Sequence, residues 1–231
     1  MKTVGIIGGI GPESTIAYYR AIIADYRQRS PDGRPPAILI NSMDVWKLLD
    51  WMEAGKLSDV TDYLLHGLQK LEQAGADFGI LAANTPHIVF DDLQRGSPIP
   101  LVSIVEATRA EAKNRGIRRV GLLGTRFTMQ ASFYSDVFAR EGITVVVPQQ
   151  DEQIYIHEKY VGVLLKDKFL PETREQLLKI IQRMKERDEI QGVILGGTEL
   201  PLLLRDDAAS GLPLLDTTQI HVLAVVSELL A

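Results

Sequence analysis

The chain has 231 residues, of which 45% are hydrophobic and 24% are charged, a composition typical of globular proteins with one large or two small domains. The formal net charge of −5 argues against a surface that binds nucleic acid or an anionic membrane. The absence of cysteine excludes disulfides, thiolate metal sites and thiol catalysis. No apolar stretch reaches the length of a membrane span or resembles a secretory signal, so we expect a cytoplasmic protein.

The first half of the chain is predicted to alternate strands with helices. Apolar residues predict a strand over 3–8, and the glycines and proline of 8–12 predict a tight turn after it. Another apolar run, 80–83, ends before Pro86, which has no N–H to donate to a β-ladder. The other predicted strands are 37–41 and 100–104, and the predicted helices are 13–29, 45–52, 58–74 and 88–94.

The second half of the chain shows the same alternation. Strands are predicted over 119–124, 144–147, 192–195 and 214–215, and helices over 106–115, 130–141, 153–166, 171–187 and 219–230. Strands that alternate with helices are typical of parallel α/β sheets, because each return to the same edge of the sheet needs a crossover helix.

Three strand-and-turn segments of the first half recur in the second half. Residues 4–8 resemble 120–124, the turn at Ala83 resembles the turn at Gly197, and 99–103 resemble 212–216, all at offsets of 113 to 116 residues. Three matches in one order at nearly one offset indicate a duplicated unit. We therefore expect an α/β fold of two pseudo-symmetric, flavodoxin-like three-layer lobes with parallel sheets and a cleft between them. The expected lobes are 1–103 plus 212–231, and 104–211.

Polar side chains follow the buried strands of both halves. Asn84, Thr85 and His87 come directly after the 80–83 run, and Thr198 and Glu199 come after the 192–195 run and its two glycines. Ligands of open parallel sheets bind at the carboxyl ends of the strands. These two turns are therefore the first candidates for a binding site.

The glycine-rich turn at 8–12 is a weaker candidate. Its N–H groups and the helix that follows could hold an anion, and a carboxylate is the ligand that we favour. A dinucleotide site is disfavoured because the third glycine of that fingerprint is missing and no strand ends in an acid about twenty residues later. A tight turn without a ligand remains the alternative. The four histidines have no metal-ligand spacing, so no metal site is expected.

Four motifs together resemble the aspartate/glutamate racemase family over nearly the whole chain. The motifs are Gly8-Gly9-Ile10-Gly11-Pro12-Glu13-Ser14-Thr15, Asn84-Thr85-Pro86-His87, Leu123-Gly124-Thr125 with Thr128, and Gly196-Gly197-Thr198-Glu199. The resemblance implies cofactor-independent racemases with two pseudo-symmetric lobes, usually homodimers, whose substrate is a small amino acid or dicarboxylate. It also implies substrate contacts from ten residues: Gly11, Ser14, Asn41, Ser42, Asn84, Thr85, Thr125, Thr128, Lys166 and Thr198.

The chain departs from this family at the catalytic positions. The family cysteines, one per lobe, fall on Ala83 and Gly197, and neither residue can carry a proton. Racemisation through a planar carbanion needs one base on each face. The possible substitutes are His87, for which capping or packing is favoured over catalysis, and Glu199, for which a supporting hydrogen-bonded role is equally favoured. Lys166 is as well explained by a solvated helix position as by substrate binding.

Two classes of function follow from this combination. The first is a racemase-like enzyme of isomerase ancestry that binds an amino acid or dicarboxylate without the two-thiol mechanism. The second is a binding protein that kept the carboxylate cradle and lost turnover. A lyase with different catalytic residues is a third possibility, and under all three no cofactor, nucleic-acid partner or membrane partner is expected.

Overall fold

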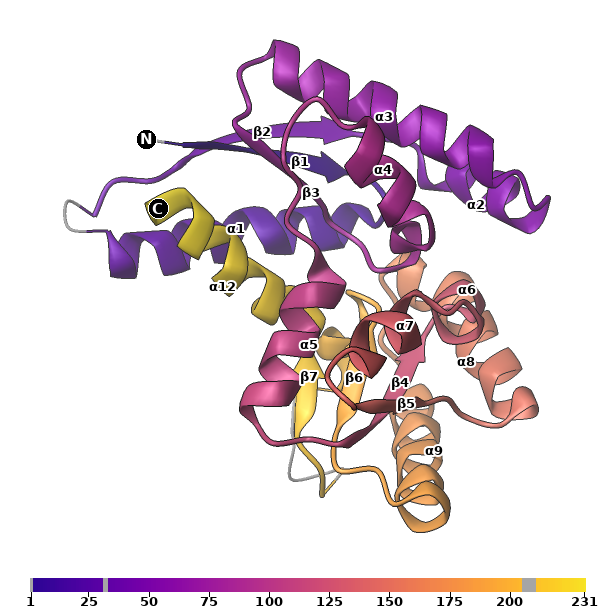
Figure 1. Ribbon diagram of the computed structural model, residues 1–231. Helices are drawn as coiled ribbons and strands as arrows, with labels where there is room; N and C mark the ends of the chain where they lie inside the picture. Colours follow the sequence, from indigo (N-terminus) through magenta and orange to yellow (C-terminus); the bar gives the residue numbers. More distant parts are fainter. Residues whose placement is uncertain (1, 31–32, 205–210) are drawn as a thin grey trace. The chain divides into compact units, whose positions relative to one another are not determined.

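The computed structural model describes residues 2–30, 33–204 and 211–231 (Figure 1). Its contacts divide the chain into two compact units, Met1–Ile104 with Thr218–Ala231, and Val105–Thr217. The sequence predicts boundaries between the two lobes after residues 103 and 211, and these two boundaries stay a prediction. Among the described residues, no helix is both long enough and apolar enough to cross a bilayer.

The first unit is built on a three-stranded parallel sheet with the order β2-β1-β3. Its strands are β1 (Thr3–Gly8), β2 (Ala37–Ser42) and β3 (Phe78–Leu81). Its helices are α1 (Pro12–Arg29), α2 (Val45–Glu53), α3 (Leu57–Gln73), the 3₁₀ helix η1 (Thr85–Val89), α4 (Phe90–Gly96) and α12 (Thr217–Leu230).

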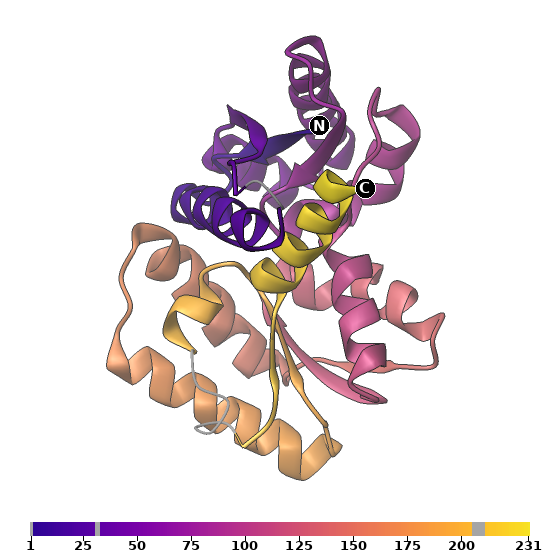
Figure 2. The ribbon, with the colours of Figure 1, turned by 90° about the vertical axis from the view of Figure 1, so that its left-hand side faces the viewer.

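The strand β1 is buried on both faces because helices cover both sides of the sheet (Figures 1 and 2). Val4 and Ile6 pack in one cluster with apolar residues of α1 and α12. Gly5 lies on the opposite face, where a Cβ on it would stand 3.1 Å from the Cβ of Leu71 in α3. Side chains alternate between the faces of a strand, so this short apolar sequence supplies two core layers at once.

The predicted strand over 100–104 is wrong. The segment forms a single isolated bridge between Gly79 and Leu101, with the N–H of Gly79 donating to Pro100 O and the N–H of Val102 donating to Gly79 O. Pro100 cannot donate a ladder bond, and the chain enters helix α5 at Ile104, so too few residues remain for a regular strand.

The second unit repeats this order in a four-stranded parallel sheet, β5-β4-β6-β7. Its strands are β4 (Arg119–Gly124), β5 (Thr144–Val146), β6 (Val193–Gly196) and β7 (Leu214–Asp216). If the bridge at Leu101 is counted beside β3, both sheets follow the flavodoxin-like order in which the second strand precedes the first, third and fourth. The α/β fold with two parallel sheets is therefore confirmed.

The helices of the second unit depart from the prediction mainly in their interruptions. They are α5 (Ile104–Asn114), α6 (Arg126–Gln130), α7 (Phe133–Ala139), α8 (Gln150–Gly162), the 3₁₀ helix η2 (Leu164–Lys166), α9 (Pro171–Asp188) and α10 (Leu200–Leu203). The predicted helix 130–141 is shorter and corresponds to α7, because Ala131 is extended and Ser132 is the N-cap of that helix, and the short helix α6 before it was not predicted. The predicted helix 153–166 begins three residues earlier and breaks after Gly162.

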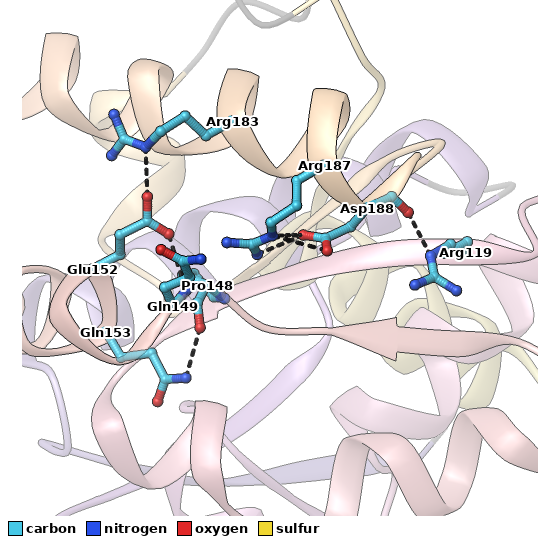
Figure 3. A network of polar contacts seen from close by, with 8 residues as sticks. All are labelled: Arg119, Pro148, Gln149, Glu152, Gln153, Arg183, Arg187 and Asp188. Atoms are coloured by element: carbon cyan, nitrogen blue, oxygen red, sulfur yellow. Dashed lines mark hydrogen bonds and ion pairs between the residues drawn. The ribbon is translucent and has the colours of Figure 1, made fainter.

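A polar network ties the amino end of α8 to α9 (Figure 3). The Glu152 carboxylate accepts the N–H of Gln149 at 3.0 Å, which closes a capping box, and accepts Arg183 Nε at 2.6 Å. Arg187 pairs with its neighbour Asp188, whose carbonyl accepts Arg119 Nε. The shallow surface pocket beside these side chains is lined by cations that already have carboxylate partners, so we assign the network to stability.

Candidate functional site

In the first unit, the turn after β3 carries the first of the two family cysteine positions. Ala83 is 7% exposed and follows the strand by two residues. The N–H of Ala82 continues the ladder by donating to Ile7 O at 3.0 Å. At this position the chain therefore presents a methyl group at the carboxyl end of the sheet, with no side-chain atom able to hold a proton.

His87 is locked into the structure of the same turn. Its Nδ1 lies 3.1 Å from Ala83 O, and its Nε2 lies 3.3 Å from the N–H of Ile104. A carbonyl can only accept and an amide N–H can only donate, so the ring is neutral, with its proton on Nδ1. The ring also stacks on Phe90 at 4.7 Å. His87 thus fastens the turn to the start of α5.

Burial lowers the pKa of His87 from its ordinary value of 6.5 to about 3, with a further contribution from His221. A group that stays neutral to so low a pH, with both ring nitrogens already hydrogen-bonded, is a weak candidate for a general base. The geometry agrees with the capping role that the sequence favoured. His221 is held in a similar way, with Tyr18 Oη 2.9 Å from Nδ1 and Val102 O 2.9 Å from Nε2.

The glycine-rich turn between β1 and α1 is closed largely by its own residues. The Thr15 hydroxyl accepts the N–H of Gly9 at 2.9 Å and donates to Gly11 O at 3.1 Å. Gly9 and Gly11 have φ of 74° and 124°, values that favour glycine. Ser14 is buried and donates its hydroxyl proton to Ala82 O at 2.9 Å. Ser14 can therefore offer a ligand only an acceptor oxygen in this arrangement.

The remaining predicted residues of the first unit lie at the same edge of the sheet. Asn41 and Ser42 close β2, where Asn41 is half-buried and donates its amide to Gly67 O at 3.2 Å, while Ser42 is exposed. Asn84 is buried and Thr85 is half-buried in the turn after β3. These groups gather at the carboxyl ends of neighbouring parallel strands, the edge at which ligands bind in such sheets.

In the second unit, Thr125 and Thr128 form the turn after β4. Thr125 caps α6 by accepting the N–H of Thr128 at 3.3 Å, and the two hydroxyl oxygens lie 3.2 Å apart. Beside them, a Cβ on Gly124 would stand 2.7 Å from Gly196 O. Both strands therefore end in glycine because their backbones lie too close together for a side chain.

Gly197, the second family cysteine position, is covered by an aromatic side chain from α8. A Cβ built on Gly197 would stand 2.3 Å from Cε2 and 2.7 Å from the hydroxyl oxygen of Tyr160. Carbon atoms do not approach that closely, so the Tyr160 ring fills the space that a cysteine side chain would need. Gly197 is absent from the residues with positive φ, so the obstacle is the ring and not the backbone conformation.

Glu199 is buried two residues after Gly197 and receives two hydrogen bonds on one oxygen. The Tyr160 hydroxyl donates to Glu199 Oε2, and the Thr198 hydroxyl donates to the same atom at 3.0 Å. Burial raises the pKa of Glu199 above its ordinary range, and the two donors oppose that rise. Burial and the neighbouring carboxyl group raise the pKa of Tyr160 well above 10.

The structure therefore groups most of the predicted residues at two sheet edges and leaves one aside. Lys166 is the exposed last residue of η2. Tyr160 was not predicted, although on the predicted helix 153–166 it would share a face with Ile156 and Leu164 at four-residue spacing, and both of these residues are buried. That spacing predicts a core position, and nothing in the sequence shows that the core position borders Gly197. No group of His, Asp and Glu that could hold a metal is found in the described part of the chain.

Comparisons with known proteins identify the family and the fold of the chain. The sequence model of the family Asp/Glu/Hydantoin racemase matches residues 7–225. The chain is 26% identical to the broad specificity amino-acid racemase RacX of Bacillus subtilis, over 99% of this chain and 98% of that protein. It is 35% identical to the crystal structure of an aspartate racemase homologue from Pyrococcus horikoshii, with a TM-score of 0.83 and full coverage of both chains. The Picrophilus torridus aspartate racemase, at 24% identity, has the same fold with a TM-score of 0.79 over 99% of this chain and 94% of that one. The chain therefore belongs to the Asp/Glu/hydantoin racemase family.

Proposed function

We propose that the protein binds a small α-amino acid or dicarboxylate at the carboxyl ends of its strands, as a cofactor-independent isomerase-type protein that does not use paired thiols. The observation that carries this proposal is the state of the two family cysteine positions. Ala83 offers a methyl group and Gly197 is covered by Tyr160, whereas the hydroxyl and amide groups around both positions are present. The chain thus keeps the hydroxyl and amide side chains that the family resemblance assigns to substrate binding, whereas the two residues that would transfer protons are changed.

The ligand class follows from the chemistry of the surrounding side chains. Asn84, Thr85, Thr125 and Thr198 supply neutral amide and hydroxyl groups, which suit the oxygens and the ammonium group of a small amino acid. The helix α1 begins beside the turn that holds Gly11, and the partial positive charge of a helix amino end favours a carboxylate there. We extend the proposal to a homodimer, as the family resemblance implies. We also propose a cytoplasmic protein without a nucleic-acid or membrane partner, on the grounds of net charge and the apolar pattern of the sequence.

Ligand binding is tested by thermal shift and isothermal titration with both enantiomers of aspartate, glutamate and the neutral amino acids, and with succinate and glutarate. A ligand at a hundredfold excess over its Kd stabilises the folded state by about 2.7 kcal/mol. A rise in Tm with one or more of these compounds is the expected result. No shift and no heat of binding with the whole panel would refute the proposal.

The absence of paired-thiol chemistry is tested by chiral chromatography of the bound amino acid after incubation. Removing one positioned acid or base typically lowers a rate by a factor of about 10² to 10⁴, so very slow conversion between enantiomers is expected. Conversion at the rate of an ordinary enzyme, about 10 per second, would show that other side chains act as an efficient pair of bases.

A binding protein without turnover is the second candidate, and one observation favours it. The histidine nearest to the Ala83 turn, His87, is neutral and engaged through both ring nitrogens. The two candidates differ in one measurement, exchange of the substrate α-proton with solvent, which a purely binding protein does not accelerate.

A further inference from the structure

Tyr160 and Glu199 form a buried pair of proton-carrying groups at the place where the family holds a thiol. The pair comes from two separate elements, the last turn of α8 and the turn after β6. The hydroxyl oxygen of Tyr160 would stand 2.7 Å from a Cβ at position 197, so the phenol occupies the space of a cysteine side chain at that turn. Both side chains are nearly inaccessible, at 6% and 2% exposed.

We propose that the Tyr160 hydroxyl, backed by the Glu199 carboxylate, is the proton carrier that replaces the thiol of position 197. This inference rests on the proposed function, because it requires a bound α-amino acid. As the α-carbon–hydrogen bond breaks, its proton passes to the Tyr160 oxygen and the Tyr160 proton passes to Glu199 Oε2. The electron pair of the broken bond is delocalised into the carboxyl group of the ligand. The proton on Glu199 exchanges with solvent water, and the return of a solvent-derived proton through Tyr160 restores the amino acid.

Glu199 is suited to accept that proton. An alcohol or phenol is a weak base unless a neighbouring base takes its proton, and the Tyr160 hydroxyl donates to this carboxylate. Burial raises the pKa of Glu199, which makes the carboxylate a stronger base than an exposed one. Thr198 donates to the same oxygen and holds the carboxylate in one orientation.

The use of a single proton carrier determines the outcome of this chemistry. Tyr160 both takes the proton and gives it back, so the proton returns to the face from which it left. The structure therefore points to exchange of the α-proton with retention of configuration, limited to the enantiomer whose hydrogen faces Tyr160. This is an activity different from racemisation, and it gives a distinct signal in heavy water.

The test follows the α-proton of D- and L-glutamate and D- and L-aspartate by NMR in D₂O, with chiral chromatography of the same samples. Loss of the α-proton signal of one enantiomer, without formation of the other, is expected. Tyr160→Phe keeps the ring over Gly197 and removes the hydroxyl, and Glu199→Gln keeps a hydrogen-bonding partner and removes the base. Each should lower the exchange rate at least about a hundredfold while the amino acid still binds in a titration.

Tyr155→Phe is the matched control, because it makes the same substitution on the same helix at a half-buried position and should leave exchange unchanged. The exchange rate of the parent should rise with pH as Glu199 loses its proton, and Glu199→Gln should remove that rise. An amino acid that binds but shows no exchange above buffer overturns this inference and favours the second candidate function, a binding protein without turnover, while amino-acid binding itself stands. Exchange that survives Tyr160→Phe or Glu199→Gln also overturns it, whereas failure of all binding overturns the proposed function itself.

Discussion

Replacement of Gly197 by cysteine is expected to destabilise the protein strongly, although cysteine is the residue of the family at that position. The new Cβ would stand 2.3 Å from Tyr160 Cε2, so the ring must move or the turn must shift. Overpacking of a well-packed site typically costs about 1–3 kcal/mol. A displaced ring also loses its hydrogen bond to Glu199, and such bonds to charged groups contribute about 1.5–3 kcal/mol. The free energy of unfolding should therefore fall by about 2.5–6 kcal/mol.

Urea unfolding under reducing conditions measures this loss, with Gly162→Cys as the control. Gly162 ends α8, is exposed, and would place its Cβ where nothing lies within 4 Å. The control should remain within about 0.5 kcal/mol of the parent. A double-mutant cycle with Tyr160→Ala isolates the clash, since removal of the ring should reduce the cost of Gly197→Cys by about 2–3 kcal/mol.

Two results would refute this reasoning. If Gly197→Cys unfolds at the same urea midpoint as Gly162→Cys, the ring does not occupy the side-chain space of position 197. If the cost of Gly197→Cys is unchanged when Tyr160 is alanine, the strain arises elsewhere in the turn. In either case the proposed replacement of the thiol by the phenol would lose its structural basis.

Three further predictions concern activity, pH and stability. Ala83→Cys with Gly197→Cys should racemise glutamate or aspartate measurably only when Tyr160→Ala is added, and chiral chromatography with equal activity in the two- and three-site variants would contradict this. Burial lowers the pKa of His87 to about 3 and that of His221 to about 4, from 6.5, so the unfolded chain takes up protons first. The contribution of each histidine to stability should be complete above about pH 6.5 and fall below it by up to about 1.4 kcal/mol per pH unit. Urea titrations of His221→Gln should show a shallower fall than those of the parent, and an equally steep fall would contradict this. Glu152→Ala should cost about 1–2 kcal/mol because it opens the capping box of α8, whereas Arg183→Ala, which removes only a half-exposed partner, should cost less than about 1 kcal/mol; equal losses would contradict this.

Much of the fold could be predicted because β1, β3, β4 and β6 are buried on both faces and end in clear stop signals. The apolar run of β1 and the repeated run of β4 stand out from the charged helices, and their glycine endings mark the turns. The same reasoning predicted a strand around Leu101 that does not form. That segment has the apolar composition of a strand but pairs through a single isolated bridge and not through a ladder of hydrogen bonds. An apolar composition indicates that a segment is buried. Burial alone does not distinguish a strand from an extended connection.

The candidate site was only partly predictable, for a different reason. The turns at 83–87 and 197–199 could be found because their polar residues directly follow strands. The engagement of His87 depends on the N–H of Ile104, seventeen residues away, and the covering of Gly197 depends on Tyr160, thirty-seven residues away. Contacts of this kind are fixed by how a helix packs on a sheet, and sequence spacing along one element does not contain them.

The two family cysteine positions have changed in physically different ways, and this difference bears on what the chain can do. At Ala83 the position still has a Cβ, and one added sulfur would complete a cysteine there. At Gly197 the space of the missing side chain is filled by the Tyr160 ring of α8, and the hydroxyl of that ring is hydrogen-bonded to Glu199. A return to two thiols therefore needs cysteine at 83 and a coordinated change at 160 and 197 that leaves Glu199 with a hydrogen-bond donor. A buried carboxyl group left without donors is costly, so the tyrosine and the glycine are expected to vary together.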